Sequence, residues 1–304
     1  MNYDVVIVGG GPSGLSAALA LGRARKNVLL CDSGPPRNAA AEDVYNFVTR
    51  DKTPPAEFRR IGREQLKTYP NVEVRDTRVE SIGGDKGAFE VRLESETVHA
   101  RRVILSTGMR DQMLPIEGFK ELWGQSIFQC PYCHGWETAD RKWGYLVHPT
   151  RADHLLPFAL QARGWTEDLT VYTAGAFEIP PEAQERLKSA GISICTDAIA
   201  RLRIQNGHLD GVEFSDGRSL PCDVLYTHPP QSQVPVVQGL GVDLDESGMV
   251  TTTMMGETSI PGIYAAGDLT TPMQSVVTGA AAAMRAAAAL NLDLAMEFTL
   301  EVAT

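Results

Sequence analysis

The sequence predicts an α/β protein with two nucleotide-binding domains of the three-layer, Rossmann-like kind. Three observations lead to this prediction. The chain has 304 residues, which suggests two domains at roughly 150 residues each. It opens with a strand, a glycine-rich loop and a helix, followed by a second strand, which together form a βαβ unit. A weaker copy of this unit lies near the middle of the chain.

The composition is that of a folded, acidic protein. Hydrophobic residues make up 43% and charged residues 22%, which excludes a disordered chain. The net charge of −10 argues against nucleic acid or an anionic membrane as a partner. No apolar run reaches the roughly 18 residues of a membrane span and no signal-peptide pattern is present, so we expect a cytoplasmic protein. Five cysteines are too few, and odd in number, for a disulfide scaffold.

The first βαβ unit begins with a continuous apolar run at residues 4–8, which is typical of a buried parallel strand. Residues 15–25 are rich in Ala and Leu and predict a helix. Residues 27–32 predict the second strand, which ends in an acidic residue, Asp32. The loop between the first strand and the helix therefore lies where dinucleotide-binding folds hold a diphosphate.

The glycines of this loop have the spacing that a diphosphate requires. Gly9 permits the tight turn, Gly11 lets the backbone approach the diphosphate, and Gly14 lets the helix pack against the strand. The helix start offers unpaired N–H groups to an anion, and we expect Ser13 to contribute to the same site. Asp32 is placed to accept hydrogen bonds from a ribose. Taken alone, the loop does not distinguish NAD from FAD.

The remaining elements are placed by alternation and turn signals. Residues 71–105 predict a small antiparallel layer that returns to a core strand, and residues 199–224 predict a second such layer. Residues 262–266 form an apolar strand that leads into Gly267-Asp268 and a long Ala-rich helix.

Two further motifs join the glycine loop in resembling the FAD-dependent pyridine nucleotide-disulfide oxidoreductases, in particular the low-molecular-weight thioredoxin reductases. They are the runs at residues 106–108 and 259–268. The resemblance covers nearly the whole chain and implies FAD as cofactor and a homodimer. It places Asp268 on the ribityl chain, Gln274 beside the isoalloxazine and Asn46 near the flavin. The implied cofactor-binding residues outside the glycine loop are Asn46, Thr107, Gly108, Gly267, Asp268 and Gln274.

The run Cys130-Pro-Tyr-Cys133-His134 is the most informative stretch for chemistry. Two cysteines at this spacing can close and reopen a disulfide, and the dipole at a helix start lowers a thiol pKa. A zinc site would need further ligands at close spacing, whereas Cys195 and Cys222 are each isolated, so we expect no metal. His134, with an ordinary pKa of about 6.5, suits a group that accepts a thiol proton.

The position after the second cysteine departs from the thioredoxin reductases, which usually carry Asp where this chain has His134. The run Cys-x-x-Cys-His-Gly instead resembles the FAD dithiol oxidases that close disulfides in natural products such as gliotoxin, holomycin and romidepsin. The resemblance to the thioredoxin reductases implies that Cys130 faces the substrate and Cys133 the flavin. For a dithiol oxidase, we expect that O2 receives the electrons and becomes H2O2.

The second βαβ unit, at residues 142–173, lacks the glycines of the first. When the two first strands are aligned at their ends, His148, Thr150 and Asp153 stand at the three glycine positions. Side chains and a carboxylate then oppose a diphosphate, and Pro149 removes an N–H donor. Residues 172–181 contain no Lys or Arg for a 2′-phosphate. We therefore expect that NADPH is not a cofactor.

These observations combine into one domain arrangement and three functional hypotheses. We expect an FAD-binding domain at 1–118 and 231–304, with a degenerate NADPH-type domain at 119–230 inserted in it and carrying the cysteine pair. The favoured hypothesis is an oxidase acting on a small-molecule or peptide dithiol. The second is an NADPH-independent reductase that takes electrons from ferredoxin or another flavin and reduces a protein disulfide such as that of thioredoxin. The third is a flavin-bound redox sensor.

Overall fold

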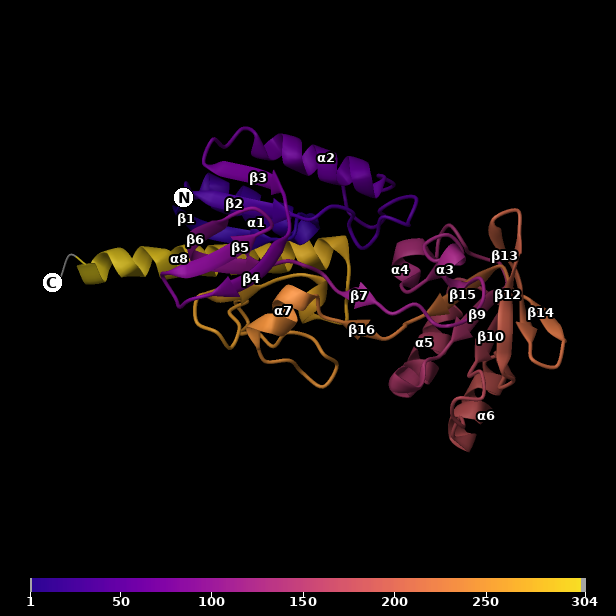
Figure 1. The fold of residues 1–304 in the computed structure, drawn as a ribbon. Helices are drawn as coiled ribbons and strands as arrows, with labels where there is room; N and C mark the ends of the chain where they lie inside the picture. Colours follow the sequence, from indigo (N-terminus) through magenta and orange to yellow (C-terminus); the bar gives the residue numbers. More distant parts are fainter. Residues whose placement is uncertain (1, 302–304) are drawn as a thin grey trace. The chain divides into compact units, whose positions relative to one another are not determined.

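The chain divides into two compact units in the computed structural model, which describes residues 2–301, with side chains through Glu297 (Figure 1). The first unit contains residues 1–39, 47–110 and 231–304, and the second contains 40–46 and 111–230. Residues 40–46 lie within the first predicted domain segment but group with the second unit.

The first unit is built on a seven-stranded sheet of order β3-β2-β1-β6-β5-β4, with β17 also paired to β6. The pairs β1–β2, β1–β6, β2–β3 and β6–β17 are parallel, whereas β4–β5 and β5–β6 are antiparallel. The strands are β1 (Asn2–Val8), β2 (Val28–Asp32), β3 (Val72–Asp76), β4 (Val79–Gly83), β5 (Phe89–Leu93), β6 (Thr97–Leu105) and β17 (Ile263–Ala265).

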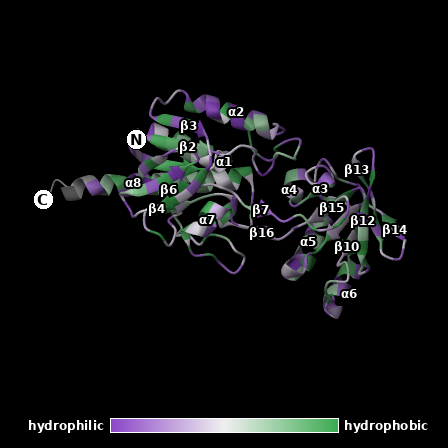
Figure 2. Cartoon of the chain, viewed as in Figure 1, coloured by the Kyte–Doolittle hydropathy of each residue, from purple (hydrophilic) through white to green (hydrophobic). Residues whose placement is uncertain are grey.

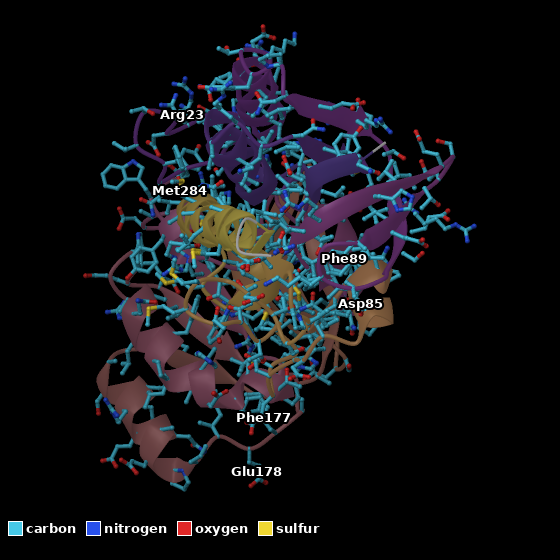
Figure 3. The ribbon with its side chains drawn as sticks, turned by 90° about the vertical axis from the view of Figure 1, so that its left-hand side faces the viewer. Arg23, Asp85, Phe89, Phe177, Glu178 and Met284 are labelled. Carbon is cyan, nitrogen blue, oxygen red and sulfur yellow. The ribbon has the colours of Figure 1, made fainter. Side chains whose placement is uncertain are left out.

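Helices α1 (Pro12–Arg23) and α8 (Val276–Glu301) pack together and on one face of this sheet (Figure 1). Their buried side chains are mostly Ala and Leu, which lets the two helices approach closely. Figure 2 shows the strands largely in the hydrophobic colour and α2 (Pro55–Leu66) largely in the hydrophilic one. Met284 lies on the exposed side of α8, whereas Phe89 on β5 is buried (Figure 3). The order β1, α1, β2, with β1 and β2 paired in parallel, confirms the expected βαβ unit.

One strand differs from its predicted role. The prediction assigned Val72 and Val74 to an antiparallel layer, but β3 is the parallel edge strand beside β2. Only β4, β5 and the start of β6 form the antiparallel part. The alternation of Val72 and Val74 indicates a strand with one buried side, and this pattern is the same for either direction of pairing.

The second unit has a five-stranded parallel sheet of order β11-β10-β9-β15-β8 and a separate antiparallel sheet of order β12-β13-β14. The parallel strands are β8 (Ile127–Phe128), β9 (Trp143–Leu146), β10 (Leu169–Tyr172), β11 (Ser193–Cys195) and β15 (Val224–Thr227). The antiparallel strands are β12 (Ile199–Gln205), β13 (His208–Phe214) and β14 (Ser219–Pro221). The α/β fold class and the antiparallel layer at 199–224 are confirmed.

The core of the second unit is aromatic where that of the first is aliphatic. Trp143 and Tyr226 are fully buried, with ring centroids 4.3 Å apart. Helices α5 (Leu155–Ala162) and α6 (Pro181–Ser189) cover one face of the parallel sheet, and the antiparallel sheet packs against its other face. This gives the unit its three layers.

The remaining elements are short. They are β7 (Arg110–Asp111), α3 (Phe119–Leu122), α4 (Pro131–His134), the 3-10 helix η1 (Pro149–His154), β16 (Gln231–Ser232), α7 (Pro235–Leu240) and the 3-10 helix η2 (Asp268–Thr270). Among the described residues, no helix combines the length and the hydropathy that crossing a bilayer requires.

Candidate functional site

The glycine loop of the first unit is held by close backbone packing. Gly9 has a φ of 111°, and a side chain there would run into the carbonyl group of Ser106, in the loop after β6. A side chain on Gly14 would run into the carbonyl oxygen of Gly9. The Ser106 hydroxyl donates to the carbonyl oxygens of Val8 (3.1 Å) and Gly9 (2.9 Å). Glycine is therefore required at both positions for β1, the loop and α1 to come together.

The start of α1 is open to an anion. Gly11 is its N-cap, no side chain caps the helix, and Pro12 occupies the first helical position. A Cβ built on Gly11 meets no atom within 4 Å, so the backbone borders open space. Unpaired N–H groups at the start of a helix and a bare approach to them suit a diphosphate. The loop therefore fits the diphosphate of a dinucleotide.

Asp32 ends β2 and is buried, at 5% exposure. Its Oδ2 accepts hydrogen bonds from Arg59 and from Arg63 (2.7 Å), two residues of α2, and its Oδ1 accepts from the Gly34 amide (3.2 Å). The Nε atoms of both arginines are buried without a hydrogen-bond partner. Buried donors of this kind usually meet a ligand or water, so the polar groups gathered at the end of β2 suit a ribose.

Asp268 and Gln274 belong to one hydrogen-bonded network. Arg37 Nη1 donates to Asp268 Oδ2 (2.8 Å) and to Gln274 Oε1 (2.6 Å). Gln274 Nε2 donates to Asp268 O (3.1 Å) and Gln231 Oε1 (2.8 Å). A side chain on Gly267 would meet the Ser13 hydroxyl, so the start of η2 lies against the start of α1. The structure therefore brings Ser13, Gly267, Asp268 and Gln274 together in the first unit.

The other predicted cofactor residues are placed differently. Thr107 and Gly108 follow β6, with the Thr107 hydroxyl donating to Gly108 O (3.3 Å) and Gly108 at a φ of 67°. Asn46 is exposed, has a φ of 60° and groups with the second unit, unlike the other predicted cofactor residues. A role for Asn46 in binding FAD remains a prediction.

The cysteine pair lies in the second unit, on either side of the first turn of α4. Both residues are partly buried, and the structure holds them as two thiols. Cys130 is the N-cap of α4, and the Cys133 amide donates to its carbonyl oxygen (3.1 Å). A hydrogen bond from the Cys133 thiol, with further ones from the backbone amides of Cys133 and Tyr132, lowers the Cys130 pKa to about 7. Because α4 has only four residues, these hydrogen bonds explain the low pKa better than a helix dipole does.

His134 ends α4 and packs among aromatic rings. Its ring stacks on Phe128 with centroids 4.3 Å apart and meets Tyr45 edge-on at 5.9 Å. Burial lowers the His134 pKa to about 4, and its Nε2 is buried without a hydrogen-bond partner. The expectation of an ordinary histidine pKa is therefore wrong, because it took no account of desolvation. His134 is a neutral imidazole at pH 7.

Tyr45 is a neighbour of His134 that the sequence analysis did not identify. Burial, followed by the negative charge of Glu137 and Asp43, raises the Tyr45 pKa to about 12. Its hydroxyl donates to Asp43 Oδ2 (3.4 Å). Tyr45 is 85 positions before Cys130 in the sequence, and no local pattern links them. The fold brings Tyr45 to His134, because residues 40–46 group with the second unit.

The turn after β9, at the position of the glycine loop in the first unit, is closed by its own side chains. His148 is the N-cap of η1, and its Nδ1 accepts from the Thr150 amide (3.3 Å) and lies 2.8 Å from the Thr150 hydroxyl. Asp153 projects into solvent 3.6 Å from His154. The amide that would meet an anion is thus already paired, and Pro149 offers none.

Aromatic rings pack around the end of β9, the strand that leads into this turn. Tyr145 on β9 packs on Phe158 of α5 with centroids 4.1 Å apart, and His228 meets the Phe158 ring edge-on at 5.4 Å. The Tyr145 hydroxyl and His228 Nδ1 are buried without a hydrogen-bond partner, and burial lowers the His228 pKa to about 4. The sequence analysis missed His228, which follows β15 directly. Its position at the carboxyl end of a buried parallel strand was the available signal.

No group of three or more His, Cys, Asp or Glu suited to a metal ion is found within residues 2–301. Cys195 and Cys222 remain separate from the Cys130 pair. Burial raises the pKa of Cys222 to about 12 and also raises that of Cys195. These two thiols are therefore poor nucleophiles at neutral pH.

Comparison with known families and curated proteins gives concordant results. Residues 3–151 and 170–287 match the family model described as pyridine nucleotide-disulphide oxidoreductase. The chain is 32% identical over 307 residues to thioredoxin reductase tcpT of Claviceps purpurea, covering 96% of this chain and 95% of that protein. It is 30% identical over 308 residues to thioredoxin reductase sirT of Leptosphaeria maculans, covering 96% and 94%.

Solved structures agree with these relatives. The structure of HlmI aligns with a TM-score of 0.91 and 32% identity, covering 99% of this chain and 95% of that one. An oxidoreductase from Agrobacterium tumefaciens aligns with a TM-score of 0.90 and 34% identity, covering 97% and 99%. The likeness extends over both units of the chain.

Proposed function

The chain belongs to the pyridine nucleotide-disulphide oxidoreductase family, of the thioredoxin-reductase-like kind, and on that basis we propose that it is an FAD-dependent dithiol oxidase. Its substrate is a small-molecule or peptide dithiol, which it converts to a disulfide through Cys130 and Cys133. The observation that carries the proposal is a contrast: the first unit keeps an open dinucleotide loop, whereas the corresponding turn of the second is capped by His148. NADPH is then not the electron donor, and thiols are.

The family implies FAD, and residues of the first unit fit it. The loop from Gly9 to Gly14 and the start of α1 would hold the diphosphate, and Asp32 would accept from the ribose. By the family resemblance, Asp268 would accept from the ribityl hydroxyls and Gln274 would lie beside the ring system. When bound, FAD would accept the two electrons of the reduced Cys130–Cys133 pair, whose disulfide re-forms, and O2 would then receive them and become H2O2.

Substrate oxidation proceeds by two thiol–disulfide exchanges. In the first, a substrate thiolate attacks Cys130 Sγ of the oxidised pair, the Cys130–Cys133 bond breaks and Cys133 leaves as a thiolate. In the second, the other substrate thiol attacks the sulfur of the substrate that is bound to Cys130, and Cys130 leaves as a thiolate. The substrate loses two electrons and two protons and becomes a disulfide. A Cys130 pKa of about 7 makes Cys130 a good leaving group in this second exchange.

His134 serves the proton transfers. As a neutral imidazole next to Cys133, it can take the proton of an incoming thiol at a ring nitrogen. Its Nε2 has no hydrogen-bond partner to compete for that role. The low pKa of about 4 means that His134 holds the acquired proton only transiently and is neutral again at pH 7.

The proposal is tested by aerobic turnover of dithiothreitol as a probe dithiol. We expect one O2 consumed and one H2O2 formed for each disulfide, with Cys130→Ser and Cys133→Ser each slowing the reaction at least about a hundredfold. His134→Asn should slow it at least about tenfold. Cys195→Ser is the matched control and should leave the rate unchanged. Thiol oxidation that persists in both cysteine variants would contradict the proposal.

A second candidate is a reductase of protein disulfides, because the relatives carry the name thioredoxin reductase. In this case electrons come from ferredoxin or another reduced flavin, and thioredoxin is the acceptor. The test compares two rates measured with this protein: reduction of oxidised thioredoxin by reduced ferredoxin, and aerobic oxidation of dithiothreitol. A faster reduction of thioredoxin would favour this candidate over the oxidase.

A further inference from the structure

Arg37 lies at the centre of the network that holds Asp268 and Gln274. It follows β2 by five residues, whereas its two acceptors are more than 230 positions away, at η2 and just before α8. The same nitrogen, Nη1, donates to both, at 2.8 Å and 2.6 Å. The first-unit segment after β2 therefore supplies a cation to the two residues that the family resemblance places at the flavin.

The Arg37–Asp268 ion pair is largely shielded from solvent. The side chains are 20% and 28% exposed. A partly buried pair of this kind is screened less by water and salt than a surface pair, and its charges act more strongly on their neighbours. Asp268 is also fixed from its backbone side, where its carbonyl oxygen accepts from Gln274 Nε2 (3.1 Å). The cation and the carboxylate are therefore held in one arrangement.

We propose that Arg37 is a positioning residue of the flavin site that also sets the charge beside the bound flavin. This inference rests on the proposed binding of FAD by Asp268 and Gln274. Two-electron reduction with uptake of one proton adds one negative charge to the flavin. A carboxylate in the flavin site opposes that reduction, and Arg37 offsets the carboxylate. Arg37 thereby favours transfer of electrons from thiols to the cofactor.

The first step of the test removes the thiols. In a Cys130→Ser/Cys133→Ser background, the flavin potential is measured anaerobically against a reference dye by its absorbance, with neither dithiol nor O2 present. A failure of the dithiol-oxidase proposal would not alter this measurement. The variants compared are Arg37→Gln, Arg37→Lys, Asp268→Asn and Arg37→Gln/Asp268→Asn. The matched control is Arg92→Gln, which removes an exposed arginine of the same unit whose ion pair is with Glu80.

Arg37→Gln should lower the equilibrium constant for flavin reduction at least about tenfold, which corresponds to about 30 mV for a two-electron couple. Asp268→Asn, which removes the opposing charge, should raise it by a similar factor. The double variant should return to within about threefold of the parent. Arg37→Lys and Arg92→Gln should also stay within about threefold, because both leave a cation beside Asp268.

Opposite shifts in the two single variants and a return in the double variant support the inference. A residue that only supports the fold would reduce FAD content and leave the potential of the bound fraction unchanged, and that result overturns it. If Arg37→Gln retains no FAD, Asp268→Asn and Arg37→Lys decide the question. An unchanged potential in Asp268→Asn, or a tenfold fall in Arg37→Lys, contradicts the inference.

Discussion

The loop after β1 and the turn after β9 each follow a central parallel strand and lead into a helix, but they differ in what closes them. The first is made of glycines, has no side-chain cap and borders open space at Gly11. The second is capped by His148, and it follows β9, whose Tyr145 packs on the ring of Phe158. Both units keep a parallel sheet with a buried core, so this sheet architecture does not depend on which residues form the turn.

The largest expected effect tests whether the glycine loop after β1 is needed to bind FAD. Gly14→Ala would push a Cβ into the Gly9 carbonyl oxygen, so we expect at least about tenfold weaker FAD binding and a nearly colourless protein. The measurement is the ratio of flavin absorbance to protein. Asp153→Ala, at the corresponding position of the second unit, and Gly239→Ala, whose Cβ meets open space, should both keep FAD. Full flavin content in Gly14→Ala would show that the loop does not need glycine at this position to bind FAD.

The next effect concerns the pKa of Cys130 in the second unit. Cys133→Ala removes the main donor that lowers the Cys130 pKa, while the backbone amides remain. The pKa should rise by about one unit from about 7, and alkylation of Cys130 at pH 7 should slow about fivefold. The rate is measured against pH with iodoacetamide on the reduced protein.

Alkylated Cys130 is distinguished from the other thiols by mass spectrometry. Burial raises the pKa of Cys31 and Cys222 to about 12, so these two should not react at pH 7. A profile in Cys133→Ala that still has its midpoint near 7 would mean that the Cys133 thiol is not the cause of the low pKa.

A third effect is on stability against pH. His134 has a pKa of about 4 in the folded protein and about 6.5 when unfolded, so the unfolded chain binds more protons between these values. The free energy of unfolding therefore falls as the pH drops from 6.5 to 4, by up to about 3 kcal/mol from this group. His134→Phe should reduce that slope, as measured by urea unfolding at pH 7 and pH 5.

The control for this experiment is His208→Asn, which changes an exposed histidine of the same unit. His228 should contribute a similar slope, because burial lowers its pKa to about 4 as well. Identical pH slopes in the wild type and His134→Phe would show that His134 is not buried in its neutral form.

The smallest effect belongs to the turn itself. His148→Ala removes a helix cap, so we expect a loss of at most about 1 kcal/mol in the free energy of unfolding at pH 7. NADPH binding should not appear, because Pro149 and Asp153 remain. Isothermal titration with NADPH checks the second point. Micromolar NADPH binding by His148→Ala would mean that the histidine alone closes the site.

The parts of this molecule that depend on adjacent residues were predictable from sequence. The strand, loop and helix around Gly9, Gly11 and Gly14 are local patterns, and so is the spacing of Cys130 and Cys133. The Rossmann-like fold class followed from those patterns and is confirmed by the sheets and the structural relatives.

The parts that depend on distant residues were not predictable. Arg37 contacts Asp268 although 231 positions separate them. Tyr45 contacts His134 although no local sequence pattern links the two. The parallel direction of β3 also escaped prediction, because alternation reports burial and not the pairing partner. The His134 pKa was missed for the same reason, since desolvation comes from rings that other segments supply.

We propose that electrons enter this protein through thiols and not through NADPH. The direct test mixes the FAD-loaded protein without oxygen, in parallel, with dithiothreitol and with NADPH, and follows the flavin absorbance. We expect bleaching by the dithiol alone, with H2O2 formed when air is admitted. Rapid bleaching by NADPH would contradict it, because the second unit would then hold a working dinucleotide site despite His148 and Pro149.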